Sequence, residues 1–540
     1  PVSRRAVLNG QPYFMRGSNF TLYRFFEDGD CRLLPWTESW VRLLHQRVKE
    51  MRWNTLRYCI GFPPEAWYDI ADEVGILIQD EFPLWQLSDV KRGELEKEYA
   101  EWIRERSNHP SVVIWDAQNE TVTPETGAAL SAVRGLDLSA RPWDNGYGSP
   151  QAPGDALEQH IYHFSPWQSF ARFTLSDLAR ADRVPHSARQ QDHEGHNAVV
   201  INEYAWLWLN RDGSPTTLTK EFYDNALGEN ATVAQRRHLY ATHFAAETEF
   251  WRSYRQVAAL MHFCSLGYSR ADGQTSDNWA DVTKLTWEPE FHRYLRDAFA
   301  PVGLMLEFWS ERVLAGKAAR VPVRLINDLA QPWTGEVHLR LHRVRADPAI
   351  RELTRSGRLD PQGSATLDFE LTWPQEPGAY VLEAELRGDG GEPVRSRREF
   401  TVETRAEQGL AFGRPATAST GPAQADGPAD ATDGDPATVW QATGPQPAWL
   451  AVDLGRVRPI RRVRIEWGFR YAVGFAVQLS SDGQAWTEVH LEKAGRGGKS
   501  EIGFAPQAAR FVRVQCQQRC LTPTQIPSPG YAIRELQVFE

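Results

Sequence analysis

The sequence predicts a multidomain chain that begins with a (β/α)8 barrel and continues into antiparallel β structure. Up to about Trp309, short apolar runs alternate with amphipathic segments, a pattern typical of parallel strands joined by helices. From Ser310 onward, strand-like alternation with Pro and Gly between the runs replaces that pattern. We therefore expect a barrel over residues 1–309, an immunoglobulin-like β-sandwich over residues 310–403, and a linker with a further domain over residues 404–540.

The bulk composition is that of a globular protein of three or four domains. The chain has 540 residues, of which 41% are hydrophobic and 24% charged. Its net charge of −10 implies no nucleic-acid or anionic-membrane partner. The five cysteines show neither a disulfide framework nor zinc-ligand spacing, and no stretch is apolar enough to span a bilayer. The chain starts in mid-phrase at Pro1 and shows no signal peptide, so we expect a trimmed chain, in which a missing signal says little about location. Separately, we expect a secreted, periplasmic or cell-surface protein.

Eight strand-like segments can be placed along the barrel. The run from Val112 to Trp115 is apolar and rich in β-branched residues, which suits a strand buried on both faces. Helical spacing of apolar residues, as at Leu44 and Val48, separates the strands. The expected strands cover residues 13–20, 55–60, 76–80, 112–115, 141–145, 157–164, 198–203 and 257–264.

Two glutamates follow the apolar cores of strands four and seven. Glu120 closes the phrase WDAQNE, and Glu203 closes the run AVVINE. The carboxyl ends of barrel strands meet at one rim, where barrel active sites lie. Two strand-end carboxylates at one rim are the minimum equipment of a glycosidase. The alternative for each Glu alone is a helix cap or a solvent-exposed strand end.

The phrase NHPSVVIWDAQNE, together with RWNTLRYCIGFPPEAWYDIADEVGILIQDE, resembles the catalytic barrel of glycoside hydrolase family 2. The resemblance covers roughly residues 8–309. It implies that Glu120 is the general acid/base and that Glu203 is the nucleophile. The family contains β-galactosidases, β-glucuronidases, β-mannosidases and exo-β-glucosaminidases, and the sequence does not choose among them.

The resemblance also implies a set of substrate-binding side chains. Arg57 should stand beside the catalytic carboxylates, with a purely structural ion pair as the alternative. In strand six, Tyr162 is preferred as the residue that touches the nucleophile, with His160 and His163 as alternatives. An aromatic residue near strand eight should support the sugar ring, although loop packing is the alternative for Trp279. The expected substrate-binding residues are Arg57, Asn119 (at the 2-hydroxyl), Tyr162, His160, Trp206 and Trp279.

No metal is expected in the barrel. In magnesium-dependent β-galactosidases of the family, a further Glu and His follow the Asp-Glu pair, whereas QDEFPLWQL carries Trp85 and Leu87 there. The strand-two histidine of those enzymes is replaced by Ile60. We therefore expect no catalytic cofactor, and both departures weaken a galactosidase assignment.

Residues 416–540 resemble a discoidin, or coagulation factor 5/8 type C, domain, which is an eight-stranded β jelly roll. The phrases that carry the resemblance are ATDGDPATVW, WLAVDLG, VQLSSDGQAW, ARFVRVQC and IRELQVFE. Carbohydrate-binding module family 32 shares this fold, so we expect an oligosaccharide or polysaccharide partner. The residues expected to bind sugar are Trp467, Phe469, Arg470, Tyr471 and Tyr531.

The same resemblance implies a structural calcium ion near the Asp-Gly-Asp turn. Its expected ligands are Asp433, Asp435, Thr438 and Glu535, which offer the oxygen atoms that calcium prefers. The alternative is an Asx turn without metal.

We expect a retaining exo-β-glycosidase that removes terminal β-linked sugars, β-galactosides or related glycosides, from glycans. In that mechanism Glu120 starts protonated and Glu203 starts ionised. β-Glucuronidase, β-mannosidase or exo-β-glucosaminidase specificity is the alternative. The rival classes are a catalytically inactive sugar-binding protein and a transglycosylase.

Overall fold

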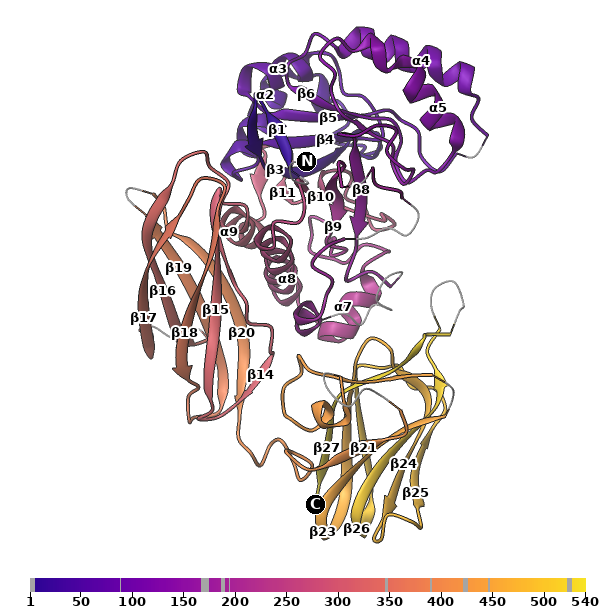
Figure 1. Ribbon diagram of the computed structural model, residues 1–540, viewed down its shortest axis with the longest axis vertical. Helices are drawn as coiled ribbons and strands as arrows, with labels where there is room; N and C mark the ends of the chain where they lie inside the picture. Colours follow the sequence, from indigo (N-terminus) through magenta and orange to yellow (C-terminus); the bar gives the residue numbers. More distant parts are fainter. Residues whose placement is uncertain are drawn as a thin grey trace.

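The computed structural model of the chain contains three bodies (Figure 1). It describes residues 5–87, 89–166, 174–185, 190–193, 195–344, 348–388, 391–420, 426–444, 447–521 and 527–540. Within these ranges, no helix is both long enough and apolar enough to cross a lipid bilayer.

Eight parallel strands form the central sheet of the first body. Their spatial order is β7-β6-β5-β4-β3-β10-β9-β8, and β7 also contacts β8, so the sheet closes on itself. The strands are β3 (Met15–Thr21), β4 (Thr55–Cys59), β5 (Leu77–Glu81), β6 (Val112–Asp116), β7 (Trp143–Asp144), β8 (Ala156–Ile161), β9 (Ala198–Tyr204) and β10 (Ala259–Leu266). The predicted fold class is confirmed.

Alternation along the strands divides the barrel into an apolar base and a charged upper layer. Met15, Ile114 and Val200 belong to a small apolar cluster drawn from several strands near their N-terminal ends. Further along the same strands, Arg57 and Asp116 are buried. The intervening residues pack in the main core, on helices α2 (Glu38–Glu50), α3 (Ala66–Val74), α4 (Arg92–Arg106), α5 (Pro124–Val133), α8 (Val233–Ser253) and α9 (Pro289–Ala298).

The second body is a β-sandwich around its own hydrophobic core. One sheet has the order β13-β15-β18 and the other β14-β20-β19-β16-β17. Its strands are β13 (Val302–Leu306), β14 (Arg312–Leu314), β15 (Ala318–Asn327), β16 (Trp333–Arg343), β17 (Arg351–Leu359), β18 (Ser364–Thr372), β19 (Gly378–Gly388) and β20 (Val394–Glu403).

The third body, which we call the C-terminal module (residues 404–540), is an antiparallel sheet wrapped around a separate core. Its strand order is β22-β27-β23-β26-β24-β25, with β21 paired to β23. These strands are β21 (Ala416–Ala418), β22 (Trp440–Thr443), β23 (Ala448–Trp467), β24 (Ala472–Ser480), β25 (Thr487–Glu492), β26 (Lys499–Arg519) and β27 (Gly530–Phe539).

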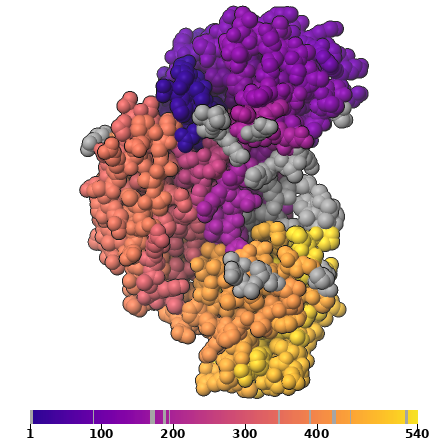
Figure 2. Space-filling view, in the orientation of Figure 1, coloured from indigo at the N-terminus to yellow at the C-terminus, as the bar shows by residue number. Residues whose placement is uncertain are grey.

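The three bodies pack against one another, and the module touches both of its neighbours (Figure 2). The sandwich and the module are joined by Arg312 and Glu466, a buried ion pair whose Nη2 and Oε2 atoms are 2.6 Å apart. Asp177 of the barrel accepts a hydrogen bond from Arg534 of the module. Buried charge pairs of this kind tie the module to the rest of the chain.

Candidate active site

Glu203 lies at the C-terminal end of β9 and is almost completely buried. Arg57 donates from Nη1 to its Oε1 at 2.9 Å, and the Tyr162 hydroxyl donates to its Oε2. Nδ1 of His160 lies 3.4 Å from the same Oε2. Burial raises the pKa of Glu203; the charges of His160 and Arg57 oppose that rise, and the charge of Glu120 adds to it.

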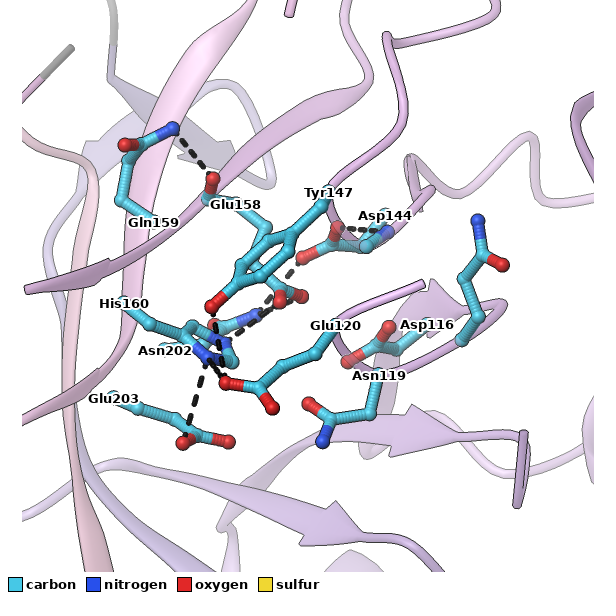
Figure 3. A network of polar contacts seen from close by, with 12 residues as sticks. Asp116, Asn119, Glu120, Asp144, Tyr147, Glu158, Gln159, His160, Asn202 and Glu203 are labelled. Carbon is cyan, nitrogen blue, oxygen red and sulfur yellow. Dashed lines mark hydrogen bonds and ion pairs between the residues drawn. The ribbon is translucent and has the colours of Figure 1, made fainter. Parts of the chain in front are cut away.

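Glu120 follows β6 and points toward Glu203 (Figure 3). Its Oε1 lies 3.0 Å from Nδ1 of His160 and accepts a hydrogen bond from the Tyr147 hydroxyl at 3.0 Å. Its Oε2 accepts a hydrogen bond from Nε1 of Trp85 at 3.1 Å. Burial alone would raise the pKa of Glu120, but the charge of His160 and these hydrogen bonds lower it to about 2.

The backbone that presents Glu120 is strained. Its φ angle is +44°, a left-handed value that non-glycine residues rarely adopt. Asn119 pairs with Trp85 in a parallel bridge, and its N–H donates to the Leu84 carbonyl at 2.8 Å. Strain of this kind concentrates at functional sites, where the surrounding structure holds it.

The two carboxylates and the imidazole between them are mutually close. One oxygen of Glu120, one ring nitrogen of His160 and one oxygen of Glu203 lie within 4.8 Å of one another. Figure 3 shows the His160 ring linked to both glutamates. The ring's other nitrogen, Nε2, lies 2.7 Å from Oε1 of Glu158, a buried residue of β8. The charges of Glu203 and Glu158 raise the pKa of His160 well above its usual value, although burial opposes this.

The protonation pattern of the free site therefore differs from the expected one. The sequence predicted a protonated Glu120 and an ionised Glu203. Three carboxylates surround the imidazole of His160 and raise its pKa, which favours a proton on the imidazole in the free site. The pKa of Glu120 is lowered to about 2, which favours its carboxylate form beside the imidazolium.

Arg57 is fully buried on β4 and organises the floor of the site. Its guanidinium is 2.8 Å from Oδ2 of Asp116, 2.7 Å from Oε2 of Glu81 and 2.9 Å from Oε1 of Glu203. Nη2 also donates to Oδ1 of Asn119 at 3.0 Å. Arg57 thus combines the two roles that the sequence left as alternatives, since it contacts the predicted nucleophile and neutralises acids beneath it.

Two amide side chains bridge the remaining acids of this floor. Nε2 of Gln79 donates to Asp116 at 2.8 Å and to Asp144 at 3.1 Å. Nδ2 of Asn202 donates to Asp144 at 2.9 Å and to Glu158 at 3.0 Å. Burial raises the pKa of Asp116 to about 7 and raises that of Asp144 well above its usual value, so this layer can hold protons at neutral pH.

The other predicted residues of the barrel separate into two groups. Trp206 packs its half-buried ring on Tyr162, at 5.0 Å between centroids, and so belongs to the site. Trp279 is buried and stacks on Trp287 at 3.6 Å, so the alternative of loop packing describes it. His163 turns away from the glutamates, with its Nδ1 3.1 Å from Glu247.

In the C-terminal module, the predicted sugar-binding residues do not form one exposed surface. Trp467 and Tyr531 are buried in the hydrophobic core, which leaves them a packing role. Arg470 and Tyr471 are partly exposed, and the Arg470 guanidinium lies 5.1 Å from the ring of Phe469. The prediction of sugar binding therefore rests on Phe469, Arg470 and Tyr471.

Three of the four predicted calcium ligands, Asp433, Asp435 and Thr438, are linked by hydrogen bonds. The Thr438 hydroxyl donates to Asp433 at 3.0 Å and to the Asp435 carbonyl at 2.7 Å. Glu535 is buried, its Oε1 has no hydrogen-bond donor among the described residues, and burial together with the charge of Asp433 raises its pKa.

Comparisons with known proteins bear on both ends of the chain. Residues 430–514 match the family model described as "NedA-like, galactose-binding domain". The C-terminal module is an F5/F8 type C domain. The predicted resemblance of this domain is thereby confirmed.

Two relatives of known name match a part of the chain. A protein of Formosa agariphila, provisionally named a β-glucuronidase, is 30% identical over 133 residues, which are 22% of this chain and 12% of that protein. The β-mannosidase of Mus musculus is 30% identical over 119 residues, 21% of this chain and 13% of the relative. Matched segments thus span about an eighth of the length of these relatives.

A solved structure extends the likeness across the domains. The β-D-mannosidase of Dictyoglomus thermophilum covers 93% of this chain with a TM-score of 0.53 at 14% identity, and 58% of that chain is covered. At this identity the likeness shows the fold alone, and it confirms the predicted architecture.

The acids near the Asp-Gly-Asp turn offer the oxygen atoms that a hard divalent cation takes. Glu535 is buried and Asp433 is partly buried, and burial raises the pKa of both carboxyl groups, that of Asp433 to about 6. Asp435 and Thr438 add further oxygen atoms on the same loop. Calcium takes six to eight such oxygen ligands and would relieve the repulsion.

Sequence reasoning missed three contributors to the active site: Trp85, Tyr147 and Glu158. Trp85 was recognised only as a departure from a metal site, yet its indole holds Glu120. Glu158 precedes His160 by two residues in LEQHIY, so strand alternation alone could have placed both inside the barrel. Tyr147 lies in a loop without a distinguishing pattern.

Proposed function

We propose that the chain is a retaining exo-β-glycosidase that removes terminal β-linked sugars. The observation that carries this proposal is the pair Glu120 and Glu203, whose nearest carboxylate oxygens lie within 4.8 Å at the rim of the barrel. Retaining glycosidases place their two carboxyl groups about 5–5.5 Å apart, whereas inverting enzymes need about 6.5–9.5 Å to admit a water molecule.

In the first step, a carboxylate oxygen of Glu203 attacks the anomeric carbon and the bond from that carbon to the leaving oxygen breaks. Glu120 gives its proton to the leaving oxygen. Arg57 and Tyr162 hold Glu203 in place through hydrogen bonds to its two oxygens. The electron pair of the broken bond stays on the leaving oxygen, which departs as a neutral alcohol.

His160 supplies the proton that Glu120 needs. In the free site the imidazole carries it, and the gap of 3.0 Å from Nδ1 to Oε1 allows direct transfer. Glycosylation removes the negative charge of Glu203, which is the strongest favourable influence on the pKa of His160. The imidazolium then becomes a stronger acid and passes its proton toward Glu120 as the leaving group departs.

In the second step, Glu120 is a carboxylate and acts as the base. It takes a proton from water, the water oxygen bonds to the anomeric carbon, and Glu203 leaves as a carboxylate. Both glutamates return to their starting charge once the proton passes back to His160. The sugar keeps its β configuration.

The sugar class remains open between β-galactosides and the alternatives of β-glucuronides, β-mannosides and β-glucosaminides. Two relatives of this chain are named β-mannosidase and β-glucuronidase. Their names favour β-mannosides and β-glucuronides over β-galactosides as substrates. The F5/F8 type C domain would bind carbohydrate, with calcium on Asp433, Asp435, Thr438 and Glu535 stabilising its loops.

A panel of 4-nitrophenyl β-glycosides tests the enzyme class. We expect turnover of at least one monosaccharide glycoside, release of the β anomer by NMR, and loss of turnover in Glu203→Gln. Initial release of the α anomer would reject retention. A chain that binds glycosides without cleaving any is the inactive rival, and products that grow with added sugar acceptor identify a transglycosylase.

Binding by the module is tested with the whole chain. Arg470→Ala combined with Tyr471→Ala should weaken retention on an immobilised glycan while kcat on a small aryl glycoside stays the same. If the wild type and the double variant are retained equally, Arg470 and Tyr471 do not belong to the binding site.

A further inference from the structure

Arg24 is a buried cation beside the candidate active site. It lies in α1 (Leu22–Phe26), directly after β3, and only 6% of its surface is exposed. Its Nε donates to the Tyr23 hydroxyl at 2.6 Å, and Nη1 donates to the Thr275 hydroxyl. Nη2 has no hydrogen-bond acceptor among the residues that the structure describes.

Four aromatic rings surround this guanidinium. Its central carbon lies 5.4 Å from the ring centre of Tyr23, 5.9 Å from Trp85, 5.5 Å from Phe263 and 5.7 Å from Tyr268. These rings attract a cation but carry no charge of their own at neutral pH. A buried charge in such surroundings costs free energy unless an anion compensates it.

The other buried arginines of the described ranges all have that compensation. Each forms an ion pair with at least one carboxylate: Arg16, Arg57, Arg106, Arg252, Arg312, Arg398 and Arg534. Arg24 forms none within the same ranges. Among the residues that the structure describes, every other buried arginine is paired with a carboxylate, and Arg24 is not.

The aromatic walls around Arg24 are shared with the catalytic carboxylates. Trp85 lies beside the guanidinium on one side and donates its indole N–H to Glu120. On the other side, Phe263 packs on Trp208 at 5.9 Å, and Trp208 packs on Tyr162 at 5.7 Å. Since Tyr162 donates a hydrogen bond to Glu203, aromatic side chains link Arg24 to both glutamates.

We propose that Arg24 binds an anionic group of the substrate, so that the sugars or aglycones this site prefers carry a carboxylate or a sulfate. The inference rests on the proposed glycosidase function and narrows its substrate class. A guanidinium presents a planar fork of N–H donors that matches either anion, and the aromatic walls exclude water from the contact.

Matched substrate pairs test this assignment. Each pair is a 4-nitrophenyl β-glycoside with a neutral C6 hydroxymethyl group, compared with the corresponding uronide and with the 6-O-sulfate of the neutral sugar. We expect the wild type to prefer one anionic member in kcat/KM. Arg24→Gln should lower the anionic-to-neutral ratio by about 100-fold, mostly through KM, as expected for a lost charge-assisted contact.

Arg270→Gln is the matched control. Arg270 stacks on the same Tyr268 ring at 4.3 Å, but it is partly exposed and pairs with Glu27 at 2.9 Å. It should leave the ratio unchanged. Arg24→Lys keeps the charge without the fork and should retain part of the preference, and circular dichroism shows whether each variant folds.

The outcomes separate this proposal from the one on which it rests. Preference for the uronide identifies a carboxylate, and preference for the sulfated sugar identifies a sulfate. Faster cleavage of every neutral member, with a ratio that Arg24→Gln does not move, overturns the role of Arg24 while the glycosidase stands. If no glycoside is cleaved, the proposal of a glycosidase is wrong. Calorimetric titration with uronates and sulfated sugars then tests the anion site by itself. Equal binding by the wild type and by Arg24→Gln would reject that site.

Discussion

The imidazole of His160 lies within 3.0 Å of the carboxylate of Glu120, so the two side chains share a single acidic proton. A neutral carboxylic acid would be the simplest general acid, yet hydrogen bonds lower the pKa of Glu120 to about 2. The proton is retained because His160 has a raised pKa. The titration that controls activity therefore belongs to the pair and not to either residue alone.

His160→Gln should move the basic limb of the kcat/KM profile to lower pH. In the wild type, the pair keeps its proton above the ordinary histidine pKa of about 6.5. Without the imidazole, only the carboxyl of Glu120 can hold it, at a pKa closer to the ordinary glutamate value of about 4.3. The measurement is kcat/KM from pH 4 to 9 on a poor leaving group. An activated aryl glycoside is the control, because its departure needs less protonation. If the basic limb of the kcat/KM profile is the same in His160→Gln as in the wild type, His160 does not store the catalytic proton.

Removal of each glutamate should have a distinct signature. Glu203→Gln should abolish turnover, because no carboxylate is left to form the covalent intermediate. Glu120→Ala should retain the first step on substrates with good leaving groups, and added azide should rescue the second by attacking the anomeric carbon directly. Product analysis should then show a β-glycosyl azide. Near-normal activity in Glu203→Gln would refute the assignment of the nucleophile.

Calcium should change how the stability of the F5/F8 type C domain depends on pH. Without the ion, the folded-state pKa of Asp433 is about 6, above the unfolded value near 3.9, because burial disfavours its charge. A raised carboxyl pKa stabilises the folded state below the unfolded pKa, and that stability is lost as the pH rises through about 6. The chelated protein should therefore melt at a higher temperature at pH 4.5 than at pH 7.

Bound calcium should remove that trend and raise the melting temperature at pH 7. An ion that binds only the folded state stabilises it by about 2.7 kcal/mol at a hundred times its dissociation constant. Glu535→Gln should reduce the effect of calcium, whereas Glu501→Gln, which alters a surface pair with Arg464, should not. If the melting curves with calcium and with chelator are identical, the Asp-Gly-Asp turn binds no metal.

The sequence was most informative where strand alternation and a short phrase agreed. Glu120 and Glu203 each follow an apolar strand, and their meeting follows from barrel geometry alone. Alternation along β8 and into the residue after it also predicts that His160 and Tyr162 lie on the same side of the chain. What it could not provide is which atom each side chain reaches, because the Nδ1 contact of His160 depends on the loop that carries Glu120.

Contacts between loops that are far apart in the sequence could not be predicted from it. Trp279 had the expected location for a sugar platform, but stacking on Trp287 buries its ring. The surroundings of Arg24 come from segments as far apart as Trp85, Phe263 and Thr275, so no local pattern marks it. Trp467 and Tyr531 were predicted to bind sugar, but both are buried in the hydrophobic core of their domain.

The buried pair of Arg312 and Glu466 gives a final prediction about how the domains are held together. Glu466→Gln leaves Arg312 buried without its closest counter-charge, so we expect a loss of about 3–5 kcal/mol in the free energy of unfolding. Arg312→Met combined with Glu466→Met should restore much of this loss, because no unpaired charge remains. Arg320→Met is the control, since it breaks an exposed pair with Asp368 in the sandwich and should cost about 1 kcal/mol or less.

Chemical denaturation of these three variants, and of Arg312→Met and Glu466→Met made singly, provides the measurement, with kcat on a small aryl glycoside as a second readout. The pair lies outside the barrel, so kcat should hold at temperatures where each variant is folded. A double variant as unstable as the two single variants added together would show that the charges do not interact, and that packing alone joins the sandwich to the F5/F8 type C domain.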